Sequence, residues 1–188
     1  MQFKGPFETE TSHELFAREI TIDLRRDDTP SQEGFQEQIY VKVLQDGDKT
    51  IILLSSEHDL FFHYTCVIDE SNFNELAQEQ NLTVNMLDFG AFIVKLLNSA
   101  LRDPRSFIIL MFLSEDGQAN VTFTENFKNY KFLEILTLPL AISTEDVIRC
   151  DITSRYLTIK QKNNDLQTQL TQLQNMIKLK LPGLMGKK

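Results

Sequence analysis

The sequence lacks an apolar run long enough to cross a bilayer. Its longest such run, FIILMFL at residues 107–113, is far shorter than the roughly 20 residues that a membrane-spanning helix requires. The first residues, MQFKGPFETETSHE, are polar and acidic, and they contain no apolar core of a signal peptide. We therefore expect no membrane among the partners of this chain.

Basic residues and cysteines are also scarce. The chain has 19 lysines and arginines against 27 aspartates and glutamates, which gives a net charge of -8. A negative surface repels phosphate backbones, so nucleic acid is not an expected partner. The two cysteines, Cys66 and Cys150, are far apart and form no CxxC pair. This spacing favours a reducing cytoplasm over a disulfide-bonded scaffold.

Motifs of catalysis and ligand binding are missing as well. The chain contains no P-loop, dinucleotide fingerprint, EF-hand loop or HExxH pair. Ser56, His58 and Asp59 have the residue types of a catalytic triad, but a triad depends on geometry in space. His58 and His63 would point to opposite faces of a strand, which does not suit a shared metal. We predict no catalytic residue, no metal and no cofactor; a small enzyme with scattered site residues is the least favoured alternative.

What the sequence does contain is the pattern of a globular domain. Hydrophobic residues make up 41% and charged residues 24% of the chain, as in ordinary globular proteins. Alternating apolar residues such as Ile20, Ile22 and Leu24 predict half-buried strands. By this pattern, strands are expected at residues 18–24, 37–44, 49–56, 59–68, 106–113, 119–125 and 131–140.

Two helices are expected between the fourth and fifth of these strands. Residues 69–80 show helical spacing behind the capping candidate Asp69, and residues 88–104 do so behind Asp88. The predicted fold class is α+β, with an antiparallel β-sandwich or barrel head that carries an inserted helical pair. The head is expected at residues 18–142, behind a flexible N-terminus at residues 1–17.

The segment at residues 143–181 is predicted to be one long coiled-coil helix. Ser143 is its capping candidate, and apolar residues along it recur at alternating spacings of four and three, the pattern of a heptad. The lone Asn163 at an a position favours a parallel two-stranded coil. The alternative is an amphipathic helix packed on its own head, and residues 182–188 form a short tail. The residues of this apolar stripe are Ile152, Tyr156, Ile159, Asn163, Leu166, Leu170, Leu173 and Ile177.

The stretch TENFKNYKF, residues 124–132, places a large apolar side chain in the middle of a polar turn. Two interpretations of Phe127 stay open from the residues alone. Its ring folds back onto its own sheet, or it enters a pocket on another molecule. In the second case Phe127, flanked by Asn126 and Lys128, is a contact between two heads.

Several short motifs, in order, resemble one family. The region SSEHDLFFHYTCVIDESNFNELAQEQNLTVNMLDFGAF is similar to the signature region of spindle assembly abnormal protein six, the hub protein of the centriolar cartwheel. That family shows the motifs D-x-FF, E-x-x-F-x-x-L, Q-x-x-L-x-V and DF-x-AF. The resemblance covers residues 37–140, and Ile93 stands where many members have a proline. The matching residues are Asp59, Phe61, Phe62, Glu70, Phe73, Leu76, Gln80, Leu82, Val84, Asp88, Phe89, Ala91 and Phe92.

The resemblance reaches ENFK, because family members carry N-x-F-K or a close variant before the last strand of the head. It implies that two heads pair by exchanging Phe127, each into a pocket on its partner. We expect that pocket near the inserted helices, at Leu82, Met86, Phe92 and Leu96.

The implied function is a self-assembling scaffold of the centriole or basal body, within the cytoplasm and cytoskeleton. The expected partners are further copies of the chain and other centriolar or basal-body proteins. Full cartwheel proteins have very long coiled coils, so the chain is either a fragment or a member of the short branch found at basal bodies and flagella. If the chain is complete, the short branch is slightly favoured. The alternative function is a head-plus-stalk dimeric adaptor of the DNA-break repair type.

Overall fold

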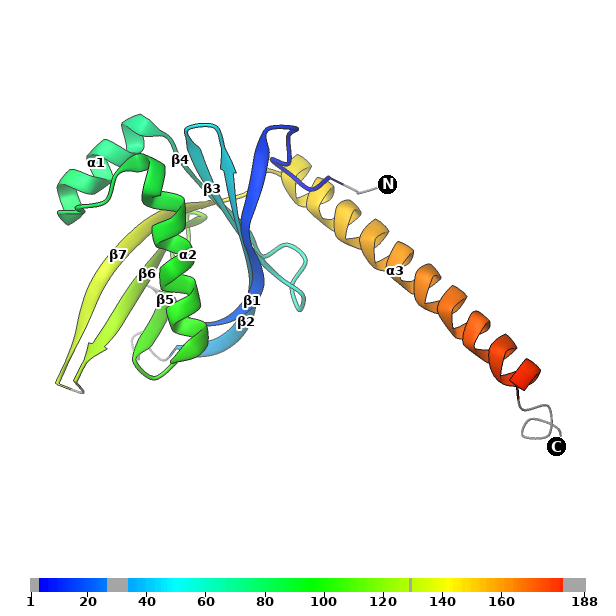
Figure 1. Ribbon diagram of the computed structural model, residues 1–188. Helices are drawn as coiled ribbons and strands as arrows, with labels where there is room; N and C mark the ends of the chain where they lie inside the picture. Colours follow the sequence, from blue (N-terminus) through cyan, green and yellow to red (C-terminus); the bar gives the residue numbers. More distant parts are fainter. Residues whose placement is uncertain (1–3, 27–33, 129, 181–188) are drawn as a thin grey trace. The chain divides into compact units, whose positions relative to one another are not determined.

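The head is a closed barrel of strands with two inserted helices (Figure 1). The computed structural model of the chain describes residues 4–26, 34–128 and 130–180. The predicted tail at 182–188 lies outside the described residues. The described elements are β1 (Ser12–Arg26), β2 (Phe35–Asp46), β3 (Lys49–Ser56), β4 (His63–Ile68), α1 (Glu70–Gln80), α2 (Met86–Arg102), β5 (Phe107–Leu113), β6 (Gln118–Phe127), β7 (Lys131–Ile142) and α3 (Glu145–Lys180).

The strands close in the order β1-β2-β3-β4-β7-β6-β5, and β5 returns to β1. The neighbouring pairs are antiparallel, as predicted, except for the closing pair. There β5 runs parallel to β1, with Asp23 opposite Leu110. The prediction of an all-antiparallel head therefore needs correction at this pair. Parallel strands cannot be joined by a tight hairpin, and the chain here reaches β5 through both helices.

Alternating residues of the strands fill the barrel, as the period-two pattern predicts. Ile20, Ile22 and Leu24 of β1 are all buried. Helix α2 completes this core, because Ile93 and Leu97 line the same small apolar interior as residues from six strands. The helical pair is therefore part of the core and not an appendage on its surface.

Gly90 lets α2 lie close to the first two strands. A Cβ atom at this position would stand 2.7 Å from Leu15 Cδ1 and 2.8 Å from Gln45 Oε1. Both distances are shorter than a Cβ atom tolerates, so a larger residue at this position would require the ends of the Leu15 and Gln45 side chains to shift. The glycine of the DFGAF element thus has a packing role in this head.

One helix start agrees with the prediction and one does not. Helix α1 is capped by Asp69, whose carboxylate accepts the N–H of Asn72 at 3.0 Å. Helix α2 begins at Met86, with Asn85 as its N-cap, and not behind Asp88. Asn85 has an extended backbone and makes no side-chain cap bond, although asparagine is a common N-cap residue. Asp88 lies in the first turn instead, where its negative charge interacts favourably with the positive N-terminal end of the helix.

Strand β1 begins at Ser12, earlier than the predicted head boundary at residue 18. Phe16 is buried and lies opposite Val43 of β2. A register shift between Glu14 and Phe16 interrupts the alternation of inward and outward side chains. Because that shift hides the start of the strand from a period-two search, the flexible segment predicted at 1–17 is too long.

The barrel closes through few bonds between β4 and β7, and we call this junction the seam. Two residue pairs join the strands there, Tyr64 with Ile142 and Thr65 with Ala141. The next outward-facing position of β7 is Pro139, two residues before Ala141. Proline has no N–H to donate to a ladder, so strand pairing stops at this point.

Helix α1 supplies the missing bonds from its side chains. Gln80 Nε2 donates to the Thr137 carbonyl at 2.7 Å, and the Thr137 N–H donates to Gln80 Oε1 at 2.8 Å. Asn72 Nδ2 donates to the Val67 carbonyl at 3.4 Å. These amides stand where a neighbouring strand would place its backbone, so α1 covers the seam through polar contacts.

Ser143 closes the other end of the seam and does not cap the last helix. Its N–H donates to the His63 carbonyl at 2.8 Å. Its hydroxyl lies 2.7 Å from His63 Nδ1 and 2.6 Å from Thr65 Oγ1. The predicted capping role is therefore wrong, because the hydroxyl is engaged by β4.

The long C-terminal helix is present as α3, a helix of 36 residues. The chain divides into two compact units, with the head at Pro6–Ile148 and a helical unit from Arg149 onward. We call the part of α3 from Arg149 the stalk helix. Within the described part of the chain, no helix is long and apolar enough to span a membrane.

Candidate self-association surfaces

The hairpin of β6 and β7 continues past its neighbour β5 and ends in a free tip (Figure 1). Strand β5 begins at Phe107, opposite Glu125, so the end of β6 has β7 as its strand partner. Phe127 is the final residue of β6 and pairs with Lys131. We call residues 124–133 the hairpin tip.

A tight turn joins the two strands at the hairpin tip. The Tyr130 N–H donates to the Phe127 carbonyl at 2.9 Å, and Lys128 has a positive φ of 51°. Lys128 Nζ lies 5.3 Å from the centre of the Phe127 ring, within the range of a cation–π contact. The sequence pattern predicts Phe127 in the middle of the turn, whereas the structure places it at the end of a paired strand. Pairing fixes the face on which its side chain lies.

The hairpin tip exposes four large apolar side chains. Phe127 is 47% exposed, Phe132 55%, Leu133 38% and Tyr130 87%. The sequence pattern singles out Phe127 alone, because Phe132 and Leu133 look there like the start of an ordinary strand. The signal for the others is the run FKNYKF, which holds three aromatic residues among six. An apolar concentration of this kind is typical of an interaction site.

Strand register distributes these side chains over both faces of the hairpin tip. Phe127 and Leu133 lie on one face, and Phe132, opposite Asn126, lies on the other. The Asn126 N–H donates to the Ser106 carbonyl at 2.7 Å, which ties the tip to the residue before β5. A tip that is anchored at its base and apolar on both faces can insert into another molecule without refolding.

The four predicted pocket residues lie between α1 and the middle of α2. Leu82, Met86 and Phe92 are partly buried and pack against the core. Leu96 is 7% exposed and belongs to the core itself, so it can only form the floor of a pocket. Figure 1 shows the α1–α2 connection and the hairpin tip at opposite ends of the head. The hairpin tip and the α1–α2 connection are therefore separate surfaces of one head.

The stalk helix carries the predicted apolar stripe on its surface. In the single chain the large stripe side chains from Tyr156 onward are between 43% exposed, at Ile177, and 64% exposed, at Ile159. Met176, at 51%, adds to the stripe and was not among the predicted residues. Helices in water gain most of their stability by burying an apolar face. The exposed stripe of the stalk helix is such a face and is available for contact with a partner helix.

Ser56, His58 and Asp59, which have the residue types of a catalytic triad, form a turn. Ser56 is buried, and its Oγ accepts the N–H of His58 at 3.0 Å and that of Asp59 at 3.3 Å. The Asp59 carboxylate accepts the N–H of Phe61 at 2.9 Å. Because these bonds hold a turn, the fourth strand starts at His63, later than predicted.

The family of the chain follows from its head. Residues 14–140 match the family model SAS-6_N, described as the centriolar protein SAS N-terminal domain. This match covers more than half of the chain and includes both the inserted helices and the hairpin tip. The chain belongs to the SAS-6 family. The suspected resemblance to the cartwheel hub protein is thereby confirmed at the level of the family.

A curated SAS-6 protein is similar to part of this chain. The spindle assembly abnormal protein 6 homolog of Danio rerio is 25% identical over an alignment of 130 residues, and the match covers 64% of this chain and 20% of the relative. The chain thus spans about one fifth of the length of that relative. The comparison therefore leaves most of the length of the relative unmatched.

Solved SAS-6 structures share the fold at low sequence identity. An N-terminal fragment of Drosophila melanogaster Sas-6 has a TM-score of 0.80 at 16% identity, over 94% of this chain and 87% of the fragment. A Leishmania SAS-6 fragment with part of its coiled coil scores 0.78 at 15%, over 94% and 99%. An N-terminal coiled-coil dimer of C. elegans SAS-6 scores 0.66 at 16%, over 84% and 94%. The Drosophila fragment is described as dimerised via its coiled-coil domain.

Proposed function

We propose that this SAS-6 chain is a structural scaffold that assembles with itself in the cartwheel of a centriole or basal body. Heads join through their hairpin tips, and stalk helices join in a parallel coiled coil. The observation that carries the proposal is the exposed apolar hairpin tip on a member of this family. The proposed location is the cytoplasmic cytoskeleton at centrioles, basal bodies and flagellar bases, where other proteins of these organelles would bind.

In the proposed head contact, each Phe127 enters a pocket of the partner head beside the α1–α2 connection. Asn126 and Lys128 flank the ring and meet the rim of that pocket. The partly buried side chains of the pocket keep some surface for the ring, and the core residue beneath them forms the floor. In chain order these pocket residues are Leu82, Met86, Phe92 and Leu96.

Energies support a weak head contact. Full burial of a phenylalanine removes about 150–200 Å² from water, worth about 4–5 kcal/mol. Phe127 starts 47% exposed, so its gain is about half of that, about 2 kcal/mol. Association costs about 4–15 kcal/mol, so two exchanged rings do not suffice. Tyr130, Phe132 and Leu133 therefore have to contribute to the interface.

The proposed stalk contact is a weak parallel coiled coil. Asn163 at an a position can pair with the same residue of the partner helix, which specifies a two-stranded parallel coil at a cost in stability. In this register Arg155 at a g position faces Lys160 at the e position of the partner, so this pair of charges repels. The dimer depends on the apolar stripe, whose residues are Ile152, Tyr156, Ile159, Leu166, Leu170, Leu173 and Ile177.

Two different two-fold contacts on one chain produce an assembly. If their axes intersect at an angle θ, successive contacts rotate each unit by twice θ, and a ring closes. A nine-fold ring, the symmetry of centrioles implied by the resemblance, needs θ of about 20°. Weak head contacts suit this geometry, because ring closure makes the last contact intramolecular.

The repair-scaffold alternative is not favoured. The family match lies on the SAS-6 head, and the net charge of -8 opposes contact with DNA. Neither observation supports an adaptor that positions enzymes on nucleic acid.

The proposed function is tested by Phe127→Glu in sedimentation velocity over a series of concentrations. We expect the wild-type chain to form species larger than a dimer, and the variant to stop at the stalk dimer. The matched control is Phe61→Glu, which places the same charge on a ring that is 75% exposed in the β3–β4 connection. Equal assembly of wild type and Phe127→Glu would contradict the proposal, and so would loss of assembly in the control.

A further inference from the structure

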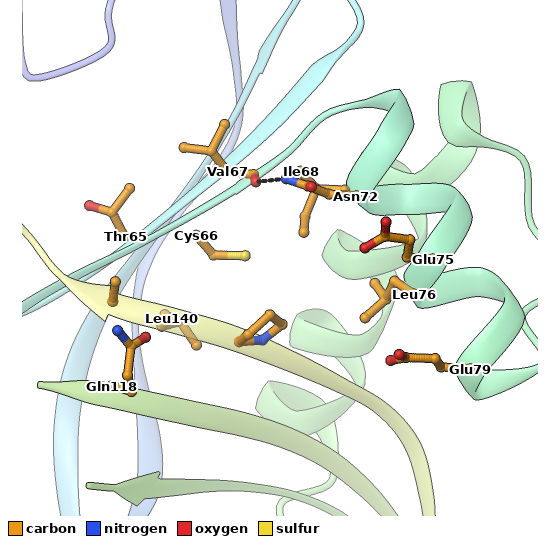
Figure 2. A pocket seen from close by; sticks show the side chains of 12 residues that line it. Thr65, Cys66, Val67, Ile68, Asn72, Glu75, Leu76, Glu79, Gln118 and Leu140 are labelled. Atoms are coloured by element: carbon orange, nitrogen blue, oxygen red, sulfur yellow. Dashed lines mark hydrogen bonds between the residues drawn. The ribbon is translucent and has the colours of Figure 1, made fainter. Parts of the chain in front are cut away.

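An open groove follows the seam between β4 and β7 (Figure 2). Its volume is ≈ 340 Å³, and it is walled by α1 on one side and by the two strand edges on the other. None of its lining residues belongs to the hairpin tip, to the proposed head pocket or to the stalk helix, so the groove is separate from the contacts proposed above. The residues that give it chemical character are Val67, Asn72, Glu75, Leu76, Glu79 and Pro139.

The α1 wall of the groove is acidic. Glu75 and Glu79 lie one helical turn apart, and Figure 2 shows both carboxylates on the groove side of α1. Among the described residues, neither carboxylate has an ion-pair partner, and the lining contains no lysine or arginine. Leu76 and Pro139 add apolar surface between them. This combination complements a long side chain with an apolar stem and a cationic end.

The β4 edge of the groove offers backbone groups. The Val67 carbonyl faces α1, where the Asn72 amide holds it at a long 3.4 Å (Figure 2). Val67 is 37% exposed, and Pro139 on the facing strand has no N–H with which to pair it. An extended chain in the groove could take over the Asn72 contact and exchange backbone hydrogen bonds with Val67.

We propose that the seam groove binds an extended peptide segment of another protein through an arginine of that segment. The arginine stem packs on Leu76 and Pro139, and its guanidinium donates to the carboxylates of Glu75 and Glu79. The peptide backbone pairs with Val67 as a short added strand. Such a site would recruit a partner to the head while leaving both self-association contacts free.

The test uses a fluorescein-labelled, capped seven-residue peptide in which threonine and valine alternate around a central arginine. Fluorescence anisotropy measures its binding to the full chain at low salt. The double substitution Glu75→Gln and Glu79→Gln is expected to weaken binding about tenfold, since each exposed ion pair contributes little alone. The control is Glu19→Gln with Glu57→Gln, which removes the same net charge from exposed positions outside the groove.

Two altered peptides test the mode of binding. Replacing arginine by neutral citrulline should weaken binding about as much as the Glu75→Gln and Glu79→Gln pair. N-methylation of the valines, which removes backbone donors, should weaken it by at least about threefold. Failure of the parent peptide to bind at millimolar concentration, or equal loss in the control pair, overturns the proposal.

Other occupants give different results. Displacement of the probe by a synthetic peptide of residues 181–188 would assign the groove to a segment of the chain itself. Loss of self-association in the Glu75→Gln and Glu79→Gln variant would assign it to a second copy. Either outcome overturns the proposal. Phe127→Glu should bind the probe as the wild type does, so failure of the assembly mechanism leaves this test intact.

Discussion

At the scale of single residues, the two cysteines show how the surroundings of a side chain change its chemical properties. Cys66 of β4 is buried, and burial raises the pKa of its thiol to about 12. Cys150 is exposed on the stalk helix and falls outside the apolar stripe. Cys66 therefore behaves as a small apolar core residue, whereas Cys150 is accessible to reagents.

The raised pKa of Cys66 predicts a loss of stability at alkaline pH. The unfolded thiol ionises near its ordinary pKa of 9.0, whereas the folded thiol keeps its proton up to about 12. The unfolded state thus releases a proton first, and the free energy of unfolding falls as pH rises above 9. When the pH is raised from 8 to 10, the free energy of unfolding measured with urea should fall by about 1 kcal/mol more for the wild type than for Cys66→Ala.

Cys150→Ala is the control for this comparison, because its thiol is exposed in the folded chain. It should lose the same stability as the wild type between the two pH values. Equal losses in the wild type and Cys66→Ala would show that the thiol is not the group responsible.

At the scale of elements, Gln80 is one of the α1 side chains that hold the seam together. Gln80 exchanges two hydrogen bonds with the backbone of Thr137, so Gln80→Ala leaves a strand edge without partners. We expect a loss of about 1–3 kcal/mol in the free energy of unfolding, measured by urea titration. The control is Gln78→Ala, an exposed glutamine on the same helix. Similar losses in both variants would contradict the proposed role of Gln80.

Asn163 sets the character of the proposed coiled coil. In the parallel register, Asn163→Ile replaces a polar pair by an apolar one, so the melting temperature of the stalk dimer should rise by about 5 °C or more. The same change should loosen the preference for two strands, which sedimentation equilibrium detects. Asn164→Ile, one position along and outside the stripe, is the matched control. An unchanged oligomer state and melting temperature would contradict the register.

Some elements of this head are readable from sequence and others are not. Helix α1 follows from local signals, because Asp69 and the apolar spacing behind it suffice. The start of β1 cannot be predicted from local signals, since the register shift at Phe16 interrupts the alternating pattern of a strand. The parallel pairing of β5 with β1 and the bonds of Gln80 are also hidden. They depend on residues far apart in sequence, which no local pattern relates.

The candidate site was read from sequence in part. Phe127 stands out as apolar among polar neighbours, and a family resemblance gave it a role. Its place at the end of a strand, and the exposure of Tyr130 and Phe132, required the pairing of β6 with β7. Leu96 could not be separated from the surface residues of α2, because helical spacing does not distinguish a core face from the wall of a pocket.

At the scale of the whole molecule, assembly requires both contacts on one chain. Either of the proposed contacts alone would give a two-fold dimer that ends with two copies, since each proposed interface uses the same surface of both partners. Only a chain with two such interfaces can continue to a third copy. The length of the assembly therefore tests the mechanism more directly than the strength of either contact.

Variants that remove one contact each should stop at different species. Phe127→Glu should leave stalk dimers, and Leu166→Glu with Leu173→Glu should leave head dimers, because charges at d positions break the coil. All three changes together should give monomers, and none of these contact-removing variants should form the rings or filaments that the wild type forms in electron micrographs at high concentration. Thr168→Glu with Gln172→Glu, outside the stripe, should assemble as the wild type does. If the variant with a broken stalk still polymerises, heads alone carry two interfaces, and the two-contact mechanism is wrong.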